Sequence, residues 1–141
     1  MIFGTSGSNG ESSGVDQASI AVDPAVDTTA GSLVVCFVKH EGTATTISVS
    51  DGTTTFDAGT YRSNGSANSH GQFHYLLVSN GGNKTYTATF GAARAFPSII
   101  LFEYTYSGTA SLDGQNTSTG VSNTPTSTNF TTTATDGVAF G

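Results

Sequence analysis

The sequence predicts an all-β protein: an antiparallel β-sandwich, jelly-roll-like, with about eight to nine short strands. Three observations lead to this fold class. Charged residues make up only 10% of the 141 residues, so the Lys and Glu that cover exposed helix faces are scarce. Apolar and polar residues alternate with a period of two, and no segment has a helical period. Turn residues, including 18 glycines, separate the alternating segments at short intervals.

The strands are expected wherever this alternation is clearest between turn residues. Two of them, residues 32–39 and 97–106, are apolar on both faces, as is typical of strands packed between two layers. In chain order the expected strands are residues 19–22, 32–39, 45–50, 53–56, 72–79, 84–90, 97–106, 126–133 and 138–140. The side chains expected in the interior are Leu33, Val35, Phe37, Tyr75, Leu77, Ile99 and Leu101.

The length predicts a single domain. Residues 1–14 include a Gly/Ser-rich stretch and are expected to form a flexible lead-in, followed by one β-sandwich domain over residues 15–141. Two polar stretches, Asp57–Ser69 and Ser107–Pro125, are expected to be long surface loops. Loops of this composition adapt to surface contact, so we expect partners to touch them or an exposed strand edge rather than a deep pocket.

Charge and hydropathy exclude two classes of partner. The net charge is −6, with four Lys and Arg together, which argues against nucleic acid because that affinity depends on cations at phosphates. No apolar run approaches the roughly 20 residues that a membrane helix needs. The single cysteine, Cys36, lies in an apolar run and is expected to be a buried small hydrophobe.

No pattern of catalytic or metal-ligating residues is found, so we expect no enzyme and no transition metal. His70 and His74 would share a metal on a helix, but on a strand they are about 13 Å apart. His40 follows an apolar strand and is expected at a turn. Structural calcium is the one ion considered, because four Asp side chains near expected loops could supply oxygen ligands: Asp23, Asp27, Asp113 and Asp136.

Glu103 is the most unusual residue, because its carboxylate lies in an apolar strand on the same face as Ile99 and Leu101. Three roles remain open for it. It hydrogen-bonds loop backbone or pairs with Arg62 or Arg94; it contacts a ligand or metal; or it acts in acid–base catalysis. Glycoside hydrolysis needs a second carboxylate about 5–10 Å away, and the sequence offers no obvious partner.

If a glycan is bound, the expected site lies at loop ends. Aromatic rings stack on sugars, and charged side chains bond their hydroxyls. The residues best suited to these roles are Tyr61, Arg62, Tyr106 and Asp113.

Five segments together resemble the Thr/Gly-rich, lectin-like jelly-roll modules of phage virion proteins and bacterial surface proteins. These segments are Ala30–Val35, Ser48–Gly52, Phe73–Tyr75, Asn83–Phe90 and Phe102–Gly108. The resemblance covers about residues 28–140. It implies a sandwich used for binding or for decorating a surface, carries no catalytic residue, and favours a structural role for Glu103.

Two functions follow as expectations. The first is a non-enzymatic virion component, such as a capsid decoration or fibre domain, because the N-terminus has no signal-peptide pattern and the strands are rich in Thr. Its partners would be other virion proteins or further copies of itself. The alternative is a carbohydrate-binding module of a secreted bacterial protein, with surface glycans as partners. The expected location is the virion or the extracellular space.

Overall fold

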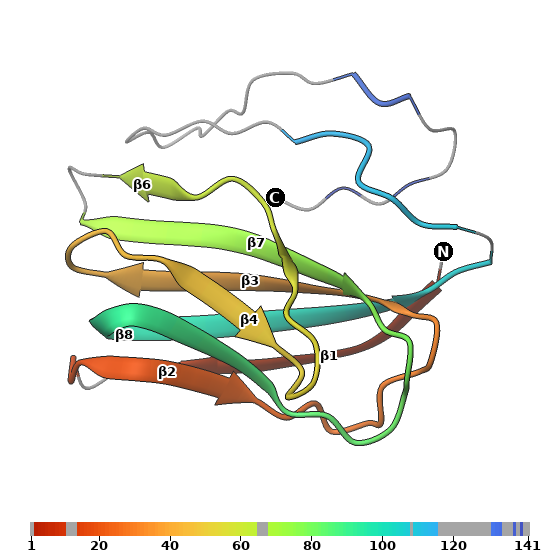
Figure 1. The fold of residues 1–141 in the computed structure, drawn as a ribbon, viewed down its shortest axis with the longest axis horizontal. Coiled ribbons are helices and arrows are strands. Elements are labelled where there is room, and N and C mark those ends of the chain that lie inside the picture. Colours follow the sequence, from red (N-terminus) through yellow and green to blue (C-terminus); the bar gives the residue numbers. More distant parts are fainter. Residues whose placement is uncertain are drawn as a thin grey trace.

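The computed structural model describes residues 2–10, 14–64, 68–107, 109–115, 131–133, 137 and 139. These residues contain eight strands and no helix, which confirms the all-β class (Figure 1). All strand pairs are antiparallel, and together they form one open sheet. The strands are β1 (Ile2–Gly10), β2 (Gln17–Val22), β3 (Leu33–Glu41), β4 (Ile47–Ser50), β5 (Asp57–Ala58), β6 (Arg62–Asn64), β7 (Ser69–Leu77) and β8 (Tyr86–Thr105).

Strand β8 organises the sheet. Its first half pairs with β2 and β4, and its second half pairs with β1 and β3. The sequence predicts two strands here, residues 84–90 and 97–106, but the structure joins them into one strand of 20 residues. Between the halves, the pairing registers shift opposite β2 and β3, and Phe96 adopts a φ of +47°. Figure 1 shows β8 bending sharply at this end of the molecule.

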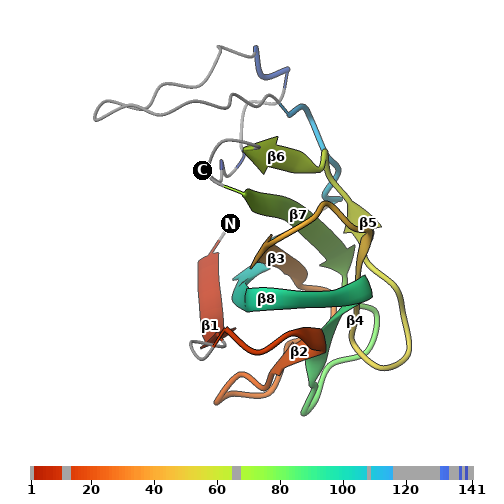
Figure 2. The same cartoon turned by 90° about the vertical axis from the view of Figure 1, so that its left-hand side faces the viewer.

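The bend brings the two halves of β8 into a common core. Side chains from β2, β4 and the first half of β8 meet the inward side chains of β3 and of the second half. Figure 2 shows the resulting curled sheet, in which β1, β8, β3, β7 and β6 follow one another. The core cluster consists of Ile20, Val22, Val34, Cys36, Val38, Ile47, Val49, Phe56, Val78, Tyr86, Ala88, Phe90, Ile99 and Leu101.

Two expectations about irregular segments are wrong. Residues 2–10 are not a flexible lead-in, because they form β1, which pairs with β8 from Phe3–Tyr104 to Gly10–Ser98. The stretch Asp57–Ser69 is not one continuous loop, because it contains β5 and β6, and both pair with β7. The expected closing strands, residues 126–133 and 138–140, fall largely outside the described residues, and residues 131–133 and 139 are not in strands.

The expected interior is partly wrong because β3 and β7 turn their other face to the core. Ile99 and Leu101 are fully buried as expected. The register places them opposite Val38 and Cys36, so the inward residues of β3 are the neighbours of the expected ones. Val35 is buried but lies outside the core cluster, whereas Leu77 is 43% exposed. Leu33, Phe37 and Tyr75 are only half-buried.

Candidate functional site

Tyr61 does not present a free ring to a ligand. Its hydroxyl accepts a hydrogen bond from the backbone N–H of Thr45 at 3.3 Å and lies 3.2 Å from Nε2 of His40. Its ring stacks on that of His70, with centroids 5.8 Å apart, and packs against the core. Tyr61 is therefore held in the structure by both its ring and its hydroxyl.

The other expected glycan-binding residues do not gather around one point. Arg62 lies on β6 opposite Gly71, near the start of β7. Tyr106 follows the end of β8, just beyond Tyr104, which pairs with the same residue of β3 as Leu77 at the far end of β7. From residue 71 to residue 77 the chain spans about 20 Å, so Arg62 and Tyr106 lie toward opposite ends of the sheet.

Asp113 is exposed and accepts a hydrogen bond from the backbone N–H of Thr133 at 2.7 Å. The neighbouring Gln115 accepts one from the N–H of Thr60 at 2.9 Å. The described part of the second polar stretch therefore returns to the connection between β5 and β6. This places Asp113 in the neighbourhood of Tyr61 and Arg62, without Tyr106.

A buried cluster of aromatic and histidine rings closes the end of the sheet where β3 ends and β7 begins. His40 and His70 stack with ring centroids 4.8 Å apart, and Phe90 meets His40 edge-on. Nδ1 of His40 lies 3.2 Å from the carbonyl oxygen of Glu41, and Nε2 of His70 lies 2.7 Å from that of Gly42. Because a carbonyl only accepts, both ring nitrogens carry the proton and donate.

The environment keeps His40 uncharged. Burial lowers the pKa of His40 below its ordinary value; the hydrogen bond to Glu41 opposes this, and the nearby His70 and Arg94 add to the lowering. A neutral His40 that donates from Nδ1 has its Nε2 free to accept the hydroxyl proton of Tyr61. The cluster thus contains a chain of hydrogen bonds from Thr45 through Tyr61 and His40 to Glu41. These bonds hold together the chain segments at this end of the sheet.

His74 and Cys36 face each other across β7 and β3, inside the core. Neither ring nitrogen of His74 has a hydrogen-bond partner among the described residues, and burial lowers its pKa to about 4. Burial also raises the pKa of the Cys36 thiol to about 12. A nucleophilic cysteine needs a low pKa and access to substrate, so this pair is not arranged for thiolate chemistry. The expected burial of Cys36 is confirmed.

Glu103 takes the first of the roles left open for it, a hydrogen bond with loop backbone. Its side chain is 2% exposed, and Oε1 accepts the backbone N–H of Thr29 at 2.7 Å. Gly4 of β1 packs against it, since a Cβ at that position would lie 3.3 Å from the carboxyl group. Glu103 therefore ties the connection between β2 and β3 to the end of β8.

Metal ligands are also dispersed. Within the described ranges, no three His, Cys, Asp or Glu residues are grouped so that they could hold a metal ion. Asp23, Asp27 and Asp113, three of the four residues considered for calcium, fall within those ranges, whereas Asp136 lies outside them. No helix among the described residues is long and apolar enough to cross a bilayer.

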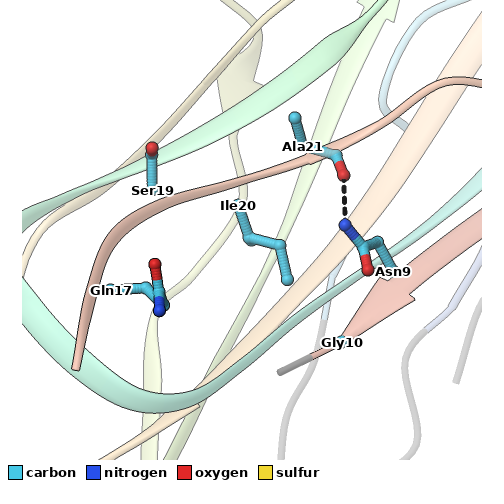
Figure 3. A pocket seen from close by; sticks show the side chains of 6 residues that line it. All are labelled: Asn9, Gly10, Gln17, Ser19, Ile20 and Ala21. Carbon is cyan, nitrogen blue, oxygen red and sulfur yellow. Dashed lines mark hydrogen bonds between the residues drawn. The ribbon is translucent and has the colours of Figure 1, made fainter. Parts of the chain in front are cut away.

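A shallow depression lies between the end of β1 and the start of β2 (Figure 3). Its volume is about 210 Å³. The side-chain amide of Asn9, which lines the depression, already has a partner, because its Nδ2 donates to the carbonyl oxygen of Ala21 at 2.7 Å. The side chains are mostly uncharged and polar, which suits hydroxyl groups better than ions. The lining residues are Asn9, Gly10, Gln17, Ser19, Ile20 and Ala21.

Another candidate surface is the side of β3, β7 and β8 that faces away from the core, where most side chains are half-buried. The register aligns three rows across these strands, and β1 adds Phe3 beside Tyr104, with ring centroids 5.7 Å apart. Ile100 and Leu77, at diagonal corners, are 39% and 43% exposed. We call this surface the outer face; its residues are Leu33, Val35 and Phe37 of β3, Phe73, Tyr75 and Leu77 of β7, and Ile100, Phe102 and Tyr104 of β8.

Sequence reasoning missed the outer face because it assigned these residues of β3 and β7 to the interior. The signal was present in the alternation, since each of these strands is apolar on both faces. Comparison with known proteins adds nothing to the site: no family model, curated protein or solved structure matches the chain.

Proposed function

We propose that the chain is a non-enzymatic structural and binding module, a component of a phage virion such as a capsid decoration or fibre domain. The observation that carries this proposal is the outer face, a broad apolar surface on a chain whose core lies on the other side of the sheet. Three exposed apolar side chains lie on or beside it, Leu77, Ile100 and Phe3, and exposed apolar patches mark protein–protein contacts. Its partners are then virion proteins, and its location is the virion.

The proposal includes a jelly-roll-like sandwich as the functional form. A sandwich needs a second apolar layer about 10 Å from the first. The bend of β8 already folds part of the sheet over the inward face. The outer face offers a surface against which another layer can pack in the assembled particle.

The buried polar groups support a binding module rather than an enzyme. His40, Glu103 and Tyr61 are engaged in hydrogen bonds that hold backbone segments or one another. His74 and Cys36 have pKa values that keep both uncharged at neutral pH. Such groups position the sheet and leave binding to its surface.

The test uses particles from a culture that produces the chain. Virions are separated on a density gradient, and their proteins are counted by mass spectrometry. We expect the chain in the particle fractions at a fixed ratio to the major capsid protein. Recovery of the chain only as secreted protein, outside the particles, would contradict the virion assignment.

The alternative function, a carbohydrate-binding module, is favoured by one observation, the depression lined by Asn9, Gln17 and Ser19 (Figure 3). Amide and hydroxyl groups are suited to bond sugar hydroxyls. A glycan array separates the two functions. Retention of a polysaccharide by the native chain, and its loss in Gln17→Ala, would support the carbohydrate-binding module. The matched control is Gln72→Ala, because Gln72 lies on β7 and instead donates to the carbonyl oxygen of Gly59.

A further inference from the structure

We propose that Cys36 and His74 form a two-ligand site for a soft monovalent cation, copper(I), inside the core. The two residues are direct partners in the register of β3 and β7. The inference goes beyond the proposed function and does not depend on it. It also departs from the expectation of no transition metal, which considered histidines along one strand and not a pair across two strands.

The first observation is that the imidazole of His74 is buried without a partner. His74 is 1% exposed, and among the described residues neither Nδ1 nor Nε2 has a hydrogen-bond partner. Buried nitrogens that bond nothing cost free energy, so native proteins rarely retain them without a role. His40 and His70 show the usual solution in this chain, because each donates to a backbone carbonyl. His74 instead keeps the open lone pair that a metal ion requires.

Cys36 supplies the second ligand. It is fully buried on the core side of β3, directly opposite His74 on β7. Directly opposed residues on one face of a sheet have Cβ atoms about 4.5–5.5 Å apart. A metal ion with bonds of about 2.3 Å to sulfur and about 2.1 Å to nitrogen spans a similar gap. Cross-strand pairing therefore places sulfur and imidazole within reach of one ion.

The kind and number of ligands select the ion. Thiolate and imidazole are ligands that copper(I) takes readily. Within the ranges that the structure describes, no third His, Cys, Asp or Glu residue joins this pair to complete a larger ligand set. Structural zinc almost always has four ligands, whereas copper(I) is satisfied by two ligands in line. The pair therefore favours copper(I) over zinc.

Charge balance also favours a monovalent ion. Without metal, both groups are uncharged at neutral pH, because burial raises the pKa of Cys36 to about 12 and lowers that of His74 to about 4. On binding, a copper–sulfur bond replaces the S–H bond, an imidazole nitrogen donates its lone pair, and the thiol proton leaves to solvent. One positive charge enters and one leaves, so the core stays neutral. A divalent ion would leave an uncompensated charge there.

The pair is closed to solvent, so the ion must enter through a local opening. Strand β5 consists of two residues, and its Ala58 pairs with His74. Both residues of β5 are exposed. Segments with few buried contacts and exposed backbone hydrogen bonds open at low cost in free energy. Opening of β5 uncovers the edge of β7 at His74 and gives the ion a route to the imidazole.

Anaerobic titration of the native chain with copper(I), supplied as its acetonitrile complex, tests the inference, and silver(I) serves as a redox-inert second probe. Native mass spectrometry should show one ion per chain, with a mass gain equal to the ion less one proton. Excess ion should raise the midpoint of thermal unfolding by at least about 5 °C, because it binds the folded state. Nitrogen NMR should show a shifted imidazole signal for His74 and unchanged signals for His40 and His70.

Two variants each remove one ligand. His74→Leu and Cys36→Ala should each weaken copper(I) binding by at least about 100-fold. His74→Leu also removes two buried unpaired nitrogens, so it should fold and keep the test valid even if Cys36→Ala does not. The matched control is Val34→Ala, which trims a fully buried side chain on the same side of β3 without touching a ligand. It should bind copper(I) within about threefold of the native chain.

Four outcomes would overturn the inference. The native chain binds neither copper(I) nor silver(I). His74→Leu binds as tightly as the native chain, which would mean that the thiol alone takes the ion. The ion lowers the midpoint of thermal unfolding, which would mean that it prefers the unfolded chain. Zinc binds as tightly as copper(I), which would contradict the selection by ligand number and charge.

Discussion

The imidazole rings of His40 and His70 lie almost parallel, 18° from coplanar, with centroids 4.8 Å apart. Each ring donates one N–H to a carbonyl of the chain segment that leaves β3. Burial in this cluster lowers the pKa of His40, so protonating His40 in the folded protein costs free energy. His40 therefore couples the stability of the protein to pH, and His74 adds to the effect from the middle of the sheet.

The free energy of unfolding should fall as the pH drops from about 6.5 toward about 4. In the unfolded chain a histidine has a pKa of 6.5, whereas in the folded protein burial lowers that of His74 to about 4. Between these values the unfolded state binds more protons, so the stability is complete above pH 6.5 and is lost on acidification. Urea unfolding at pH 7, 5.5 and 4.5 measures the loss, which reaches up to about 3 kcal/mol for His74 alone. A flat profile would contradict this account.

His74→Leu should stabilise the protein at neutral pH by about 1–3 kcal/mol, because it replaces a buried ring with two unsatisfied nitrogens by an apolar side chain of similar size. It should also flatten the pH profile between 4 and 6.5. The control is His70→Leu, which removes a 2.7 Å hydrogen bond to Gly42 and should destabilise. Equal effects of the two changes would show that the hydrogen bonds do not distinguish these histidines.

Glu103→Gln should preserve stability to within about 1 kcal/mol, because an amide oxygen can still accept the N–H of Thr29. Glu103→Leu leaves that N–H without its acceptor and should cost about 1–3 kcal/mol. Thermal unfolding of the two variants checks the difference. If Glu103→Leu is the more stable of the two, the carboxylate does not hold the loop.

Lys84→Met should destabilise the protein by about 1–2 kcal/mol, because Lys84 pairs with the buried carboxylate of Asp51 at 3.1 Å. Burial alone would raise the pKa of Asp51, but hydrogen bonds from Thr54, Thr53 and Lys84 outweigh it and hold the pKa well below its usual range. The stability that the ionised carboxylate of Asp51 contributes is present above pH about 3.8 and is lost as the pH falls further.

The control for this prediction is Lys39→Met. Lys39 and Glu41 form the same kind of pair, also within hydrogen-bond distance, but their side chains are 41% and 38% exposed. Solvent screens such a pair, so its loss should change the unfolding free energy by less than about 0.5 kcal/mol. Comparable losses in Lys39→Met and Lys84→Met would mean that burial does not decide the strength of these pairs.

The sequence predicts the strands better than it predicts their faces. The alternation in residues 45–50, with Ile47 and Val49 inward, is confirmed because only one side of this strand is apolar. In β3 and β7 both sides are apolar, so a period of two cannot tell which side meets the core. Pairing with β8 decides it, and that information is not local.

The candidate site was difficult to predict for a related reason. Tyr61 is an aromatic residue near an expected loop, as a sugar-stacking residue would be. In the structure, however, its hydroxyl is bonded to the N–H of Thr45 and its ring stacks on His70. Glu103 was correctly identified as unusual, yet its partner, Thr29, lies far away in the sequence. Joining residues 84–90 and 97–106 into β8 was also out of reach, because Gly91 and Pro97 are typical strand breakers.

The position of β8 in the chain has a consequence for synthesis on the ribosome. Four strands, β1 to β4, pair with β8, which comes last among the strands described. Among the described strands, β1 and β2 pair only with β8, so these pairs cannot form until residues 86–105 have emerged from the exit tunnel. Of the strand pairs that the structure describes, those of β7 with β3, β5 and β6 are the ones that can form before then. The nascent chain therefore carries open strand edges, which are prone to pair with other chains, through most of its translation.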